Sequence, residues 1–394
     1  MVKNQNKAQR IVIVGGGFAG CKAALELANK KNFEVTLISS SPHFEYHGAL
    51  YRSATGYSPM EVVIPIKDIL KRAKNVTFIL DTIERIDSKK NCVISIDGNL
   101  YDYDNVIFAM GNVVNYFGID GMEKYSLSMN SISHTIAIRN QLTTLFKQSG
   151  SSPTVAIVGA GASGVELAGE VEHFAKLVAN RYGIESVKPK VVLIEGADRV
   201  LPMLDAKLSE KAAERLKKLG IDLRLNTRVN SCEAGKVCLD SGDLLADCIV
   251  WTAGSRAPDF YAKHSKVFTI ERGRAKVDDY LRAYGQDNIY VLGDNANTKF
   301  SGMAQTALHD AKFVTRNFTR EVNNQPLAQY KAYHPIYVIP VGHKWAVLQT
   351  QNKKWSGYKA WLVRRKADKQ IFENFLPYKQ AIKTWRKANR LARF

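Results

Sequence analysis

Long apolar runs are missing from this sequence. No stretch of about 18 apolar residues occurs, which is the minimum for a helix that crosses a membrane. We therefore expect no transmembrane helix. The first residues, MVKNQNKAQR, are polar and lead into a strand without the apolar core of a signal peptide, which argues against secretion.

Cysteine is also scarce, and its spacing argues against two classes of site. No C-x-x-C pair occurs, and no spacing matches a set of metal ligands. An odd, scattered set indicates reduced thiols that are mostly buried, as in a cytoplasmic protein. The five cysteines are Cys21, Cys92, Cys232, Cys238 and Cys248.

The remaining composition is that of a globular protein with an excess of positive charge. A length of 394 residues is enough for two or three domains. The content of 45% hydrophobic and 24% charged residues is ordinary for a soluble protein. The net charge of +19 indicates an anionic partner surface, either nucleic acid or acidic lipid.

The most informative stretch is TVAIVGAGASGVELAGE, residues 154–170. A buried strand runs into Gly159, Gly161 and Gly164 at G-x-G-x-x-G spacing, and a helix-forming run follows. The first glycine allows a tight turn, the second lets the backbone approach phosphates, and the third lets the helix pack on the strand. This order predicts that a pyrophosphate binds at the helix N-terminus.

A second copy of the same pattern lies 144 residues earlier, in RIVIVGGGFAG. Here Gly15, Gly17 and Gly20 follow a strand at 11–14 and precede a helical run. We infer an internal duplication of dinucleotide-binding units. The predicted fold class is α/β, with two Rossmann-like domains arranged as in glutathione reductase and a basic amphipathic C-terminal region.

The residue after the second strand differs between the two copies. Glu195 follows the strand 191–194, where a carboxylate accepts hydrogen bonds from a ribose diol and repels a 2′-phosphate. This favours NADH over NADPH. The first copy has Ser39 after the strand 33–38, so it should hold its nucleotide less tightly or recruit another group, for which Glu45 is the nearest candidate.

Three further strands end at glycine. The strand 105–110 runs into Gly111, the strand 248–253 into Gly254, and the strand 289–292 into Gly293, which is followed by Asp294. The Asp294 carboxylate can bind the sugar-like chain of a cofactor. A helix predicted over 302–313 then carries Gln305 and His309 one turn apart on one face.

Taken together, these features resemble the type II NADH dehydrogenases, single-subunit NADH:quinone oxidoreductases of the two-dinucleotide-domain flavoprotein superfamily. No redox cysteine pair follows the first glycine motif, so the disulfide reductases of that superfamily fit poorly, as do sulfide:quinone oxidoreductases. The matching segments lie between Arg10 and His309 and are IVIVGGGFAG, LYRSATG, NYFGIDG, VGAGASGVELAGEV, VLPM, WTAGSRA, GDNA and AQTALH.

The resemblance implies that FAD lies on the first glycine motif, with Asp294 at its ribityl or phosphate portion, and that NADH lies on the second, with Glu195 on its ribose. It also implies that Glu166 belongs to a polar network near both rings. Gln305 and His309 would line the quinone pocket, where the histidine replaces the usual second glutamine and can donate a proton to reduced quinone. Glu166 as a helix-start acid and His309 as a structural histidine stay open as alternatives.

The C-terminal stretch 351–394 changes in composition. It carries 13 Lys and Arg residues against two acids, and three of the five tryptophans. A helix after Pro377 would place Ile382, Trp385 and Ala388 or Asn389 on one apolar stripe. Such a segment suits an anionic membrane surface. Packing of that stripe on the protein itself is the alternative. Nucleic-acid binding is not favoured, because the sequence contains no recognisable nucleic-acid-binding motif beside the positive charge.

We therefore expect an FAD-binding domain over residues 1–112 and 279–330, an NAD(H)-binding domain over 113–278, and a membrane-association region over 331–394. The expected activity is FAD-dependent NADH:quinone oxidoreduction at the cytoplasmic face of the cell membrane. Two alternatives remain open, a related NADH-dependent reductase with a soluble or protein acceptor and a flavin-binding scaffold similar to apoptosis-inducing factor. A homodimer is also open.

Overall fold

The computed structural model describes residues 8–148 and 152–391. The first seven residues of the expected FAD-binding domain and Arg393 of the basic C-terminal stretch lie outside the described residues, as does the side chain of Asn389. No helix in the described ranges has both the length and the apolar character that crossing a membrane requires.

The first unit contains a five-stranded parallel sheet in the order β22-β9-β1-β2-β5, in which β22 comes from late in the sequence. Its central strands are apolar and buried on both faces, as expected for a parallel sheet covered by helices. Helix α1 packs beside helix α9, which returns from late in the sequence. The elements are β1 (Gln9–Val14), α1 (Phe18–Leu27), β2 (Phe33–Ser39), β5 (Val76–Leu80), β9 (Asn105–Phe108), β22 (Ile289–Val291) and α9 (Ala304–Val322).

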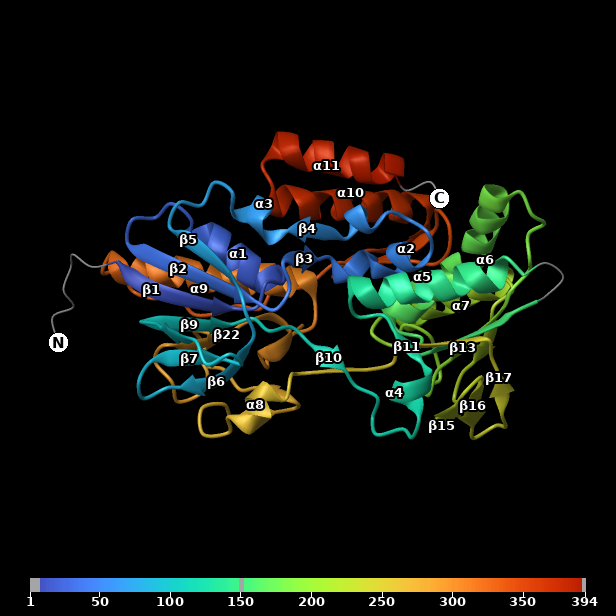
Figure 1. The fold of residues 1–394 in the computed structure, drawn as a ribbon, viewed down its shortest axis with the longest axis horizontal. Helices are drawn as coiled ribbons and strands as arrows, with labels where there is room; N and C mark the ends of the chain where they lie inside the picture. Colours follow the sequence, from blue (N-terminus) through green and yellow to red (C-terminus); the bar gives the residue numbers. More distant parts are fainter. Residues whose placement is uncertain (1–7, 149–151, 392–394) are drawn as a thin grey trace.

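The second unit, from the middle of the sequence, contains another five-stranded parallel sheet, in the order β11-β18-β12-β13-β14. The two sheets lie at opposite ends of the elongated molecule (Figure 1). The elements are β11 (Leu127–Ser128), α5 (Ile132–Phe146), β12 (Thr154–Val158), α6 (Ala162–Tyr182), β13 (Lys190–Ile194), α7 (Ala206–Lys218), β14 (Asp222–Arg224) and β18 (Cys248–Trp251).

The two halves repeat one pattern of strand, glycine turn, helix, two further strands, a three-stranded antiparallel meander and a last parallel strand. This confirms the predicted pair of Rossmann-like units. In the second unit, helix α6 continues to Tyr182. The meanders are β6 (Ile83–Asp87), β7 (Cys92–Ser95) and β8 (Leu100–Asp102) in the first unit, and β15 (Val229–Glu233), β16 (Lys236–Leu239) and β17 (Leu244–Leu245) in the second.

Two chain segments connect the units side by side. They include β10 (Val113–Val114) and β19 (Ser255–Arg256), which pair antiparallel. The other elements are short: β3 (His43–Glu45), η1 (His47–Ala49), α2 (Leu50–Ala54), η2 (Pro59–Glu61), β4 (Val63–Pro65), α3 (Ile66–Leu70), α4 (Met122–Tyr125), α8 (Phe260–Lys263), β20 (Ile270–Glu271), β21 (Arg274–Ala275) and η3 (Gly293–Asn295).

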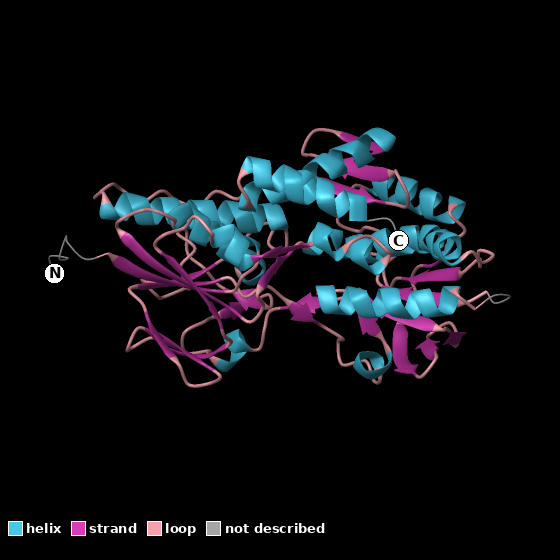
Figure 2. Ribbon diagram, turned by 45° about the horizontal axis from the view of Figure 1, so that its top comes forward, coloured by secondary structure: helices cyan, strands magenta, loops and turns pink. Residues whose placement is uncertain are grey.

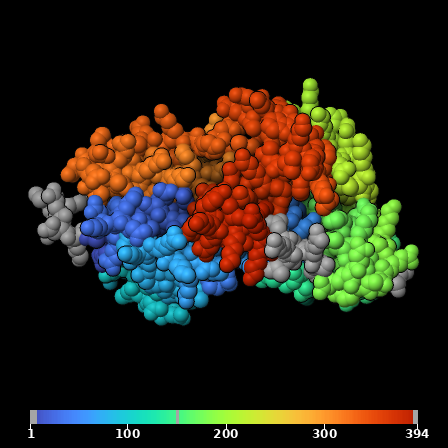
Figure 3. Space-filling model, turned by 90° about the horizontal axis from the view of Figure 1, so that it is seen from above, coloured from blue at the N-terminus to red at the C-terminus, as the bar shows by residue number. Residues whose placement is uncertain are grey.

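The C-terminal region covers the junction between the units. An antiparallel sheet of β23 (Tyr337–Pro340), β24 (Ala346–Gln349) and β25 (Lys354–Gly357) leads into α10 (Tyr358–Phe375) and α11 (Tyr378–Leu391). Figure 2 shows helices gathered along one side, with the small meanders beneath. Seen from above, the C-terminal helices lie across the middle of the molecule, between its two halves (Figure 3).

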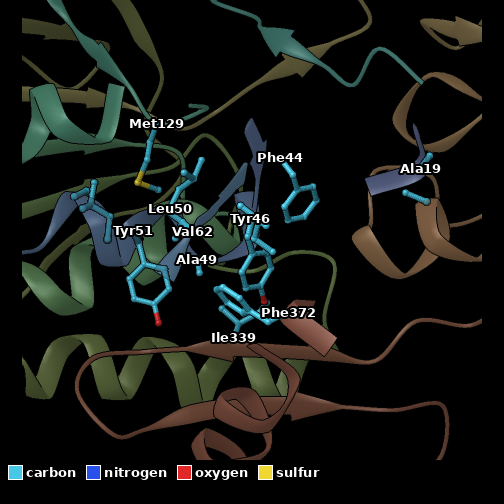
Figure 4. Packing of buried hydrophobic residues seen from close by; sticks show 14 of the residues in the cluster. Ala19, Phe44, Tyr46, Ala49, Leu50, Tyr51, Val62, Met129, Ile339 and Phe372 are labelled. Atoms are coloured by element: carbon cyan, nitrogen blue, oxygen red, sulfur yellow. The ribbon is translucent and has the colours of Figure 1, made fainter. Parts of the chain in front are cut away.

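One hydrophobic cluster joins all three parts. In Figure 4, Met129 of the second unit lies beside Leu50 of the first, and Tyr46 points toward Phe372 of α10. Because this packing is continuous, the C-terminal region is part of the folded core and not an appended tail.

Candidate functional site

The first glycine turn has the geometry that its motif predicts. Gly15 has φ +113°, and a Cβ there would lie 2.2 Å from the carbonyl oxygen of Ala109, so only glycine fits. A Cβ on Gly20 would lie 1.8 Å from the Gly15 carbonyl oxygen, which lets α1 pack closely on β1. By contrast, a Cβ on Gly17 would meet no described atom within 4 Å, so the helix begins beside open space.

The second turn repeats this geometry at the other sheet. Gly159 has φ +103°, and its Cβ would lie 2.6 Å from the Cα of Ala253. A Cβ on Gly164 would lie 1.8 Å from the Gly159 carbonyl oxygen. Gly161 again faces space that no described atom fills within 4 Å.

The two helix N-termini suit a phosphate. In the described chain, neither α1 nor α6 has a side-chain cap or an acidic residue in its first turn. The backbone N–H groups there remain available, and the helix dipole favours an anion. The residues present therefore fit two dinucleotides, one on each unit.

Glu195 is held against the second glycine turn. Its Oε2 accepts a hydrogen bond from the backbone N–H of Ala160 at 2.7 Å, and its Oε1 accepts one from Ala197 at 3.0 Å. Both bonds fix the carboxylate beside the loop, where a ribose diol could still donate to its remaining lone pairs.

Ser39 has the same position in the first unit but a different environment. It is buried against Gly16, and its Oγ accepts a hydrogen bond from the backbone N–H of Ser41 at 3.2 Å. Glu45, the expected substitute for the missing carboxylate, accepts a hydrogen bond through its Oε2 from the N–H of Ile132 at the start of α5. Its role at the nucleotide stays a prediction.

The strand ends of the first sheet form a polar corner. Asp294 accepts a hydrogen bond from the side-chain amide of Asn112, while the Asn295 amide donates to the Gly111 carbonyl oxygen at 2.6 Å. Tyr261 donates to the Asn295 Oδ1 at 3.0 Å. The sequence pointed to Asp294 and Gly111, and Asn295 lies within the matching segment GDNA, but no motif indicated Asn112 or Tyr261.

Gly254 is placed by the crossover between the units. Its Cβ would lie 2.6 Å from the carbonyl oxygen of Asn115, in the neighbouring connecting segment. Asn115 donates its backbone N–H to the Gly254 carbonyl oxygen at 3.1 Å. Gly254 therefore keeps the two connections in close contact.

Glu166 lies in the first turns of α6 and is buried. Its Oε1 accepts a hydrogen bond from Nη1 of Arg364 at 2.7 Å. Burial raises the pKa of the Glu166 carboxyl to about 7, although the Arg364 charge opposes this shift. Glu166 is thus part of a buried polar network, and its place near the two cofactor rings stays a prediction.

Arg364 is the residue that sequence analysis missed, because it belongs to the basic stretch that we assigned to a membrane surface. Its guanidinium contacts all three parts of the fold: Glu166 of the second unit, the Gly48 carbonyl oxygen of the first, and the Val338 carbonyl oxygen of β23 at 2.9 Å. Nε donates to Asp368 at 2.7 Å. Arg364 therefore joins the three parts at one point.

The groups around Arg364 balance its charge. The Arg364 and Arg365 charges lower the pKa of the Asp368 carboxyl against its burial, and Tyr46 donates its hydroxyl to Asp368 at 2.8 Å. Burial and the Asp368 charge raise the pKa of Tyr46, so this hydroxyl stays protonated. The result is a buried, hydrogen-bonded ion network, which is costly to disrupt.

Gln305 and His309 lie on one face of α9, as predicted, and both hold the segment before β23. Gln305 donates to the Ile336 carbonyl oxygen at 2.8 Å and accepts from the Ile336 N–H at 3.1 Å. His309 Nε2 lies 2.9 Å from the Lys331 carbonyl oxygen, so this nitrogen carries a proton if it bonds there. The His309 ring also packs near Tyr330 and Tyr333.

Asp310, next to His309, is a second residue that no motif indicated. It is buried, its Oδ2 accepts from the Gly293 N–H at 3.0 Å, and its Oδ1 accepts from the Tyr330 hydroxyl at 2.7 Å. Burial raises the pKa of Asp310 to about 6. Asp310 therefore ties α9 to the glycine that precedes Asp294.

The cysteine thiols are free, and most are buried within the described ranges. Burial raises the pKa of Cys232 to about 11 and of Cys248 to about 12, and it raises that of Cys21 further. These three thiols stay protonated near neutral pH and are poor nucleophiles.

Comparison with known proteins agrees with this geometry. The family model of the pyridine nucleotide-disulphide oxidoreductases matches residues 9–311. A type II NADH:quinone oxidoreductase of Mycobacterium tuberculosis is 31% identical over 384 residues, which cover 91% of this chain and 83% of that protein. A type II NADH:quinone oxidoreductase of Staphylococcus aureus is 26% identical, covering 91% of this chain and 94% of that protein.

Solved structures share the fold. The NDH2 of Plasmodium falciparum in complex with NADH superposes with a TM-score of 0.85 at 19% identity, covering 98% of this chain and 99% of the other. The sulfide:quinone oxidoreductase of Aquifex aeolicus gives a TM-score of 0.79, also at 19% identity, covering 97% and 92%. The family resemblance seen in the motifs is thus confirmed, and the chain belongs to the pyridine nucleotide-disulphide oxidoreductases and, within them, to the type II NADH:quinone oxidoreductases.

Proposed function

We propose that this chain catalyses NADH:quinone oxidoreduction with FAD as its cofactor. The observation that carries the proposal is the pair of open glycine turns, at Gly17 and Gly161, in two units joined by the Arg364 network. FAD, when bound, would accept the hydride of NADH and deliver two electrons to the quinone. The protein contributes binding, orientation and the exclusion of water.

Each cofactor is assigned to one unit. We assign FAD to the turn at Gly15, Gly17 and Gly20, with Asp294 at its ribityl or phosphate portion. NADH is assigned to the turn at Gly159, Gly161 and Gly164, with the Glu195 carboxylate as acceptor for its ribose hydroxyls. The bond from the Ala160 N–H to Glu195 supports this assignment, because it holds a negative charge where a 2′-phosphate would be repelled.

The Glu166 network is proposed to keep the two units in register for hydride transfer. Arg364 contacts Glu166 in the second unit and the Gly48 carbonyl oxygen in the first, so it limits how far the units can move apart. A fixed separation of donor and acceptor is the main contribution a protein makes to such a transfer.

Gln305 and His309 are proposed to belong to the quinone pocket. Their bonds to Ile336 and Lys331 indicate that they act by positioning the segment before β23, which leads directly to the Val338 carbonyl bound by Arg364. In this proposal, the His309 imidazole is also a proton donor for reduced quinone.

Peripheral binding to an anionic membrane, on the cytoplasmic face, is the third part of the proposal. The apolar stripe of α11 does not supply the contact, because Ala381 and Ala388 are buried and Trp385 packs on Phe372. Exposed apolar residues lie instead on α10, where Tyr358 is 55% and Leu362 46% exposed. Basic residues that face solvent on α11 can add attraction to anionic lipid; they are Lys379, Lys383, Arg386 and Lys387.

Steady-state turnover tests the activity. Purified protein should carry the absorbance spectrum of a flavin and oxidise NADH quickly only when a quinone analogue is present. Equal NADH oxidation with a soluble protein acceptor and no quinone would favour the related reductase. Colourless protein that FAD cannot reconstitute would refute the enzyme proposal.

Vesicle binding tests the membrane contact. Leu362→Glu should reduce sedimentation with anionic vesicles, because it places a charge in the proposed contact. Leu245→Glu is the matched control, since Leu245 is 73% exposed on β17, away from α10. Equal sedimentation of both variants and the wild type would show that α10 does not meet the membrane.

A further inference from the structure

Helix α6 and the hairpin between β23 and β24 approach each other closely behind the Glu166 network. A Cβ on Gly169 of α6 would lie 2.3 Å from the backbone nitrogen of Gly342 in the hairpin. The Gly342 position is constrained in turn, since its φ is +80°. These two glycines fix the hairpin on the helix and bring the side chains that flank them together.

Three of these side chains form a cluster of metal-ligand type. Glu170 and His173 lie one turn apart on α6, and His343 follows Gly342 in the hairpin. One ligand atom from each lies within 4.8 Å of the others. The two imidazole rings stack with their centroids 4.2 Å apart and an interplanar angle of 27°.

The Glu170 carboxylate lacks the partner that a buried charge requires. Glu170 is only 3% exposed, and its buried Oε2 has no hydrogen-bond partner in the part of the chain that the structure describes. Such an atom costs free energy unless a ligand or ion satisfies it.

The nearest cations are engaged with other acids. Arg52 donates twice to Glu61, at 2.5 and 3.1 Å, and Arg365 donates to Asp368 at 2.9 Å. Their charges act on Glu170 only from a distance. A cation bound directly would compensate this carboxylate.

We propose that Glu170, His173 and His343 bind one divalent transition-metal ion of the Zn²⁺ type. Two imidazole nitrogens and one carboxylate oxygen are the ligands of a three-residue zinc site, which leaves a fourth position open. His343 is exposed, so the ion can enter from solvent and the imidazole can rotate toward it. Each ligand atom would need to come within about 2 Å of the ion.

The ion would connect the two parts of the fold without taking part in redox chemistry. Helix α6 carries both Glu166 and Glu170, one turn apart, and the hairpin strand β23 carries the Val338 carbonyl that binds Arg364. A redox-inert ion at this place would fasten the hairpin to α6 and stabilise the folded protein by mass action. This role is independent of the proposed quinone reduction.

Metal content of the full-length protein gives the test. After dialysis against buffered Zn²⁺, wild-type protein should hold one zinc per chain, and Zn²⁺ should raise its thermal unfolding midpoint. Cobalt added in place of zinc should give visible d–d absorption bands typical of a low-coordinate site. Glu170→Gln and His343→Ala should each weaken Zn²⁺ binding at least about tenfold, because each removes a ligand.

Matched controls separate this site from surface binding. Glu172→Gln alters a carboxylate on the same helix that pairs with Lys176, and His43→Ala alters an exposed imidazole on β3. Both controls should keep wild-type zinc content and affinity. His343→Ala decides the matter if Glu170→Gln does not fold, because His343 is exposed in a turn. Wild-type protein that dialyses free of zinc, or equal binding by His343→Ala, would overturn the proposal.

Discussion

The two dinucleotide units share one backbone but hold different side chains at the equivalent point. In the first, Val14 pairs with Ile38, and in the second, Val158 pairs with Ile194, so Ser39 and Glu195 occupy matching positions. Glu195 accepts two backbone hydrogen bonds through a charged group, whereas Ser39 accepts one through a neutral hydroxyl.

This difference indicates how each unit binds its nucleotide. The second unit presents a fixed carboxylate to a ribose, which suits a substrate that exchanges in every turnover. The first unit lacks that group but has the polar corner of Asn112, Asp294 and Asn295 beside the ends of β9 and β22. A resident cofactor can be bound along its length and needs no strong contact at one end.

The largest expected effect comes from breaking the link between the units. Arg364→Met should lower the free energy of unfolding by about 3–5 kcal/mol, because Glu166 would remain buried without its partner and Asp368 would keep only Arg365 and the Tyr46 hydroxyl. Denaturant unfolding measures this. Lys383→Met, at an exposed position of α11, is the control and should change it by no more than about 0.5 kcal/mol. A similar small change for Arg364→Met would mean that the network does not join the units.

The next prediction distinguishes the ligands of the two glycine turns. Gly161→Ala should weaken NADH binding about a hundredfold or more, since a methyl group would occupy the phosphate position, and it should leave FAD content unchanged. Gly17→Ala should do the reverse. Neither Cβ meets a described protein atom within 4 Å, so both variants should fold. Loss of both ligands in either variant would contradict the assignment of one nucleotide to each unit.

The next prediction concerns Glu195 and Ser39, the side chains at matching positions of the two units. Glu195→Ala should weaken NADH binding about 10- to 100-fold, because it removes the hydrogen bonds that the ribose donates to a charged acceptor. The KM for NADH should rise accordingly. Ser39→Ala should change FAD affinity by less than about threefold, because the hydroxyl is a weak, neutral partner. Isothermal titration of each ligand measures both. An unchanged NADH affinity in Glu195→Ala would remove the ribose role.

A separate effect is a pH dependence of stability that comes from Asp310 in the first unit. Burial raises its pKa to about 6, against the Gly293 N–H and Tyr330 hydrogen bonds and the His309 charge, and Asp294 adds repulsion. The folded protein thus holds this proton more tightly than the unfolded chain. Stability should fall as pH rises from about 4 to about 6, by at most about 1.4 kcal/mol per pH unit.

Asp310→Asn tests that dependence. The variant should show a flatter curve of unfolding free energy against pH over this window, because the amide does not titrate. Asp243→Asn, at an exposed turn beside β17, should leave the curve as in the wild type. A wild-type slope in Asp310→Asn would show that another group carries the effect.

Sequence analysis succeeded where chemistry is local. The glycine turns, the strands before them and the carboxylate of Glu195 lie within short segments whose spacing encodes their geometry. The pairing of Gln305 and His309 on one helical face also follows from local periodicity.

The contacts of Glu166 could not be predicted from the sequence in the same way. Arg364 and Glu166 are 198 residues apart in the chain, and Arg364 stands in a run of basic residues that has no internal signal for burial. The sequence could not decide what the apolar stripe of α11 contacts, since an amphipathic helix is equally suited to a membrane surface and to the core of its own protein. Only tertiary packing distinguishes the two.

Anaerobic mixing of the FAD-loaded protein with NADH, followed by a quinone analogue, tests the central claim most directly. The account predicts that one NADH bleaches the absorbance of one flavin per chain and that one quinone restores it. Flavin that NADH leaves unbleached, or that stays reduced after quinone is added, would contradict it.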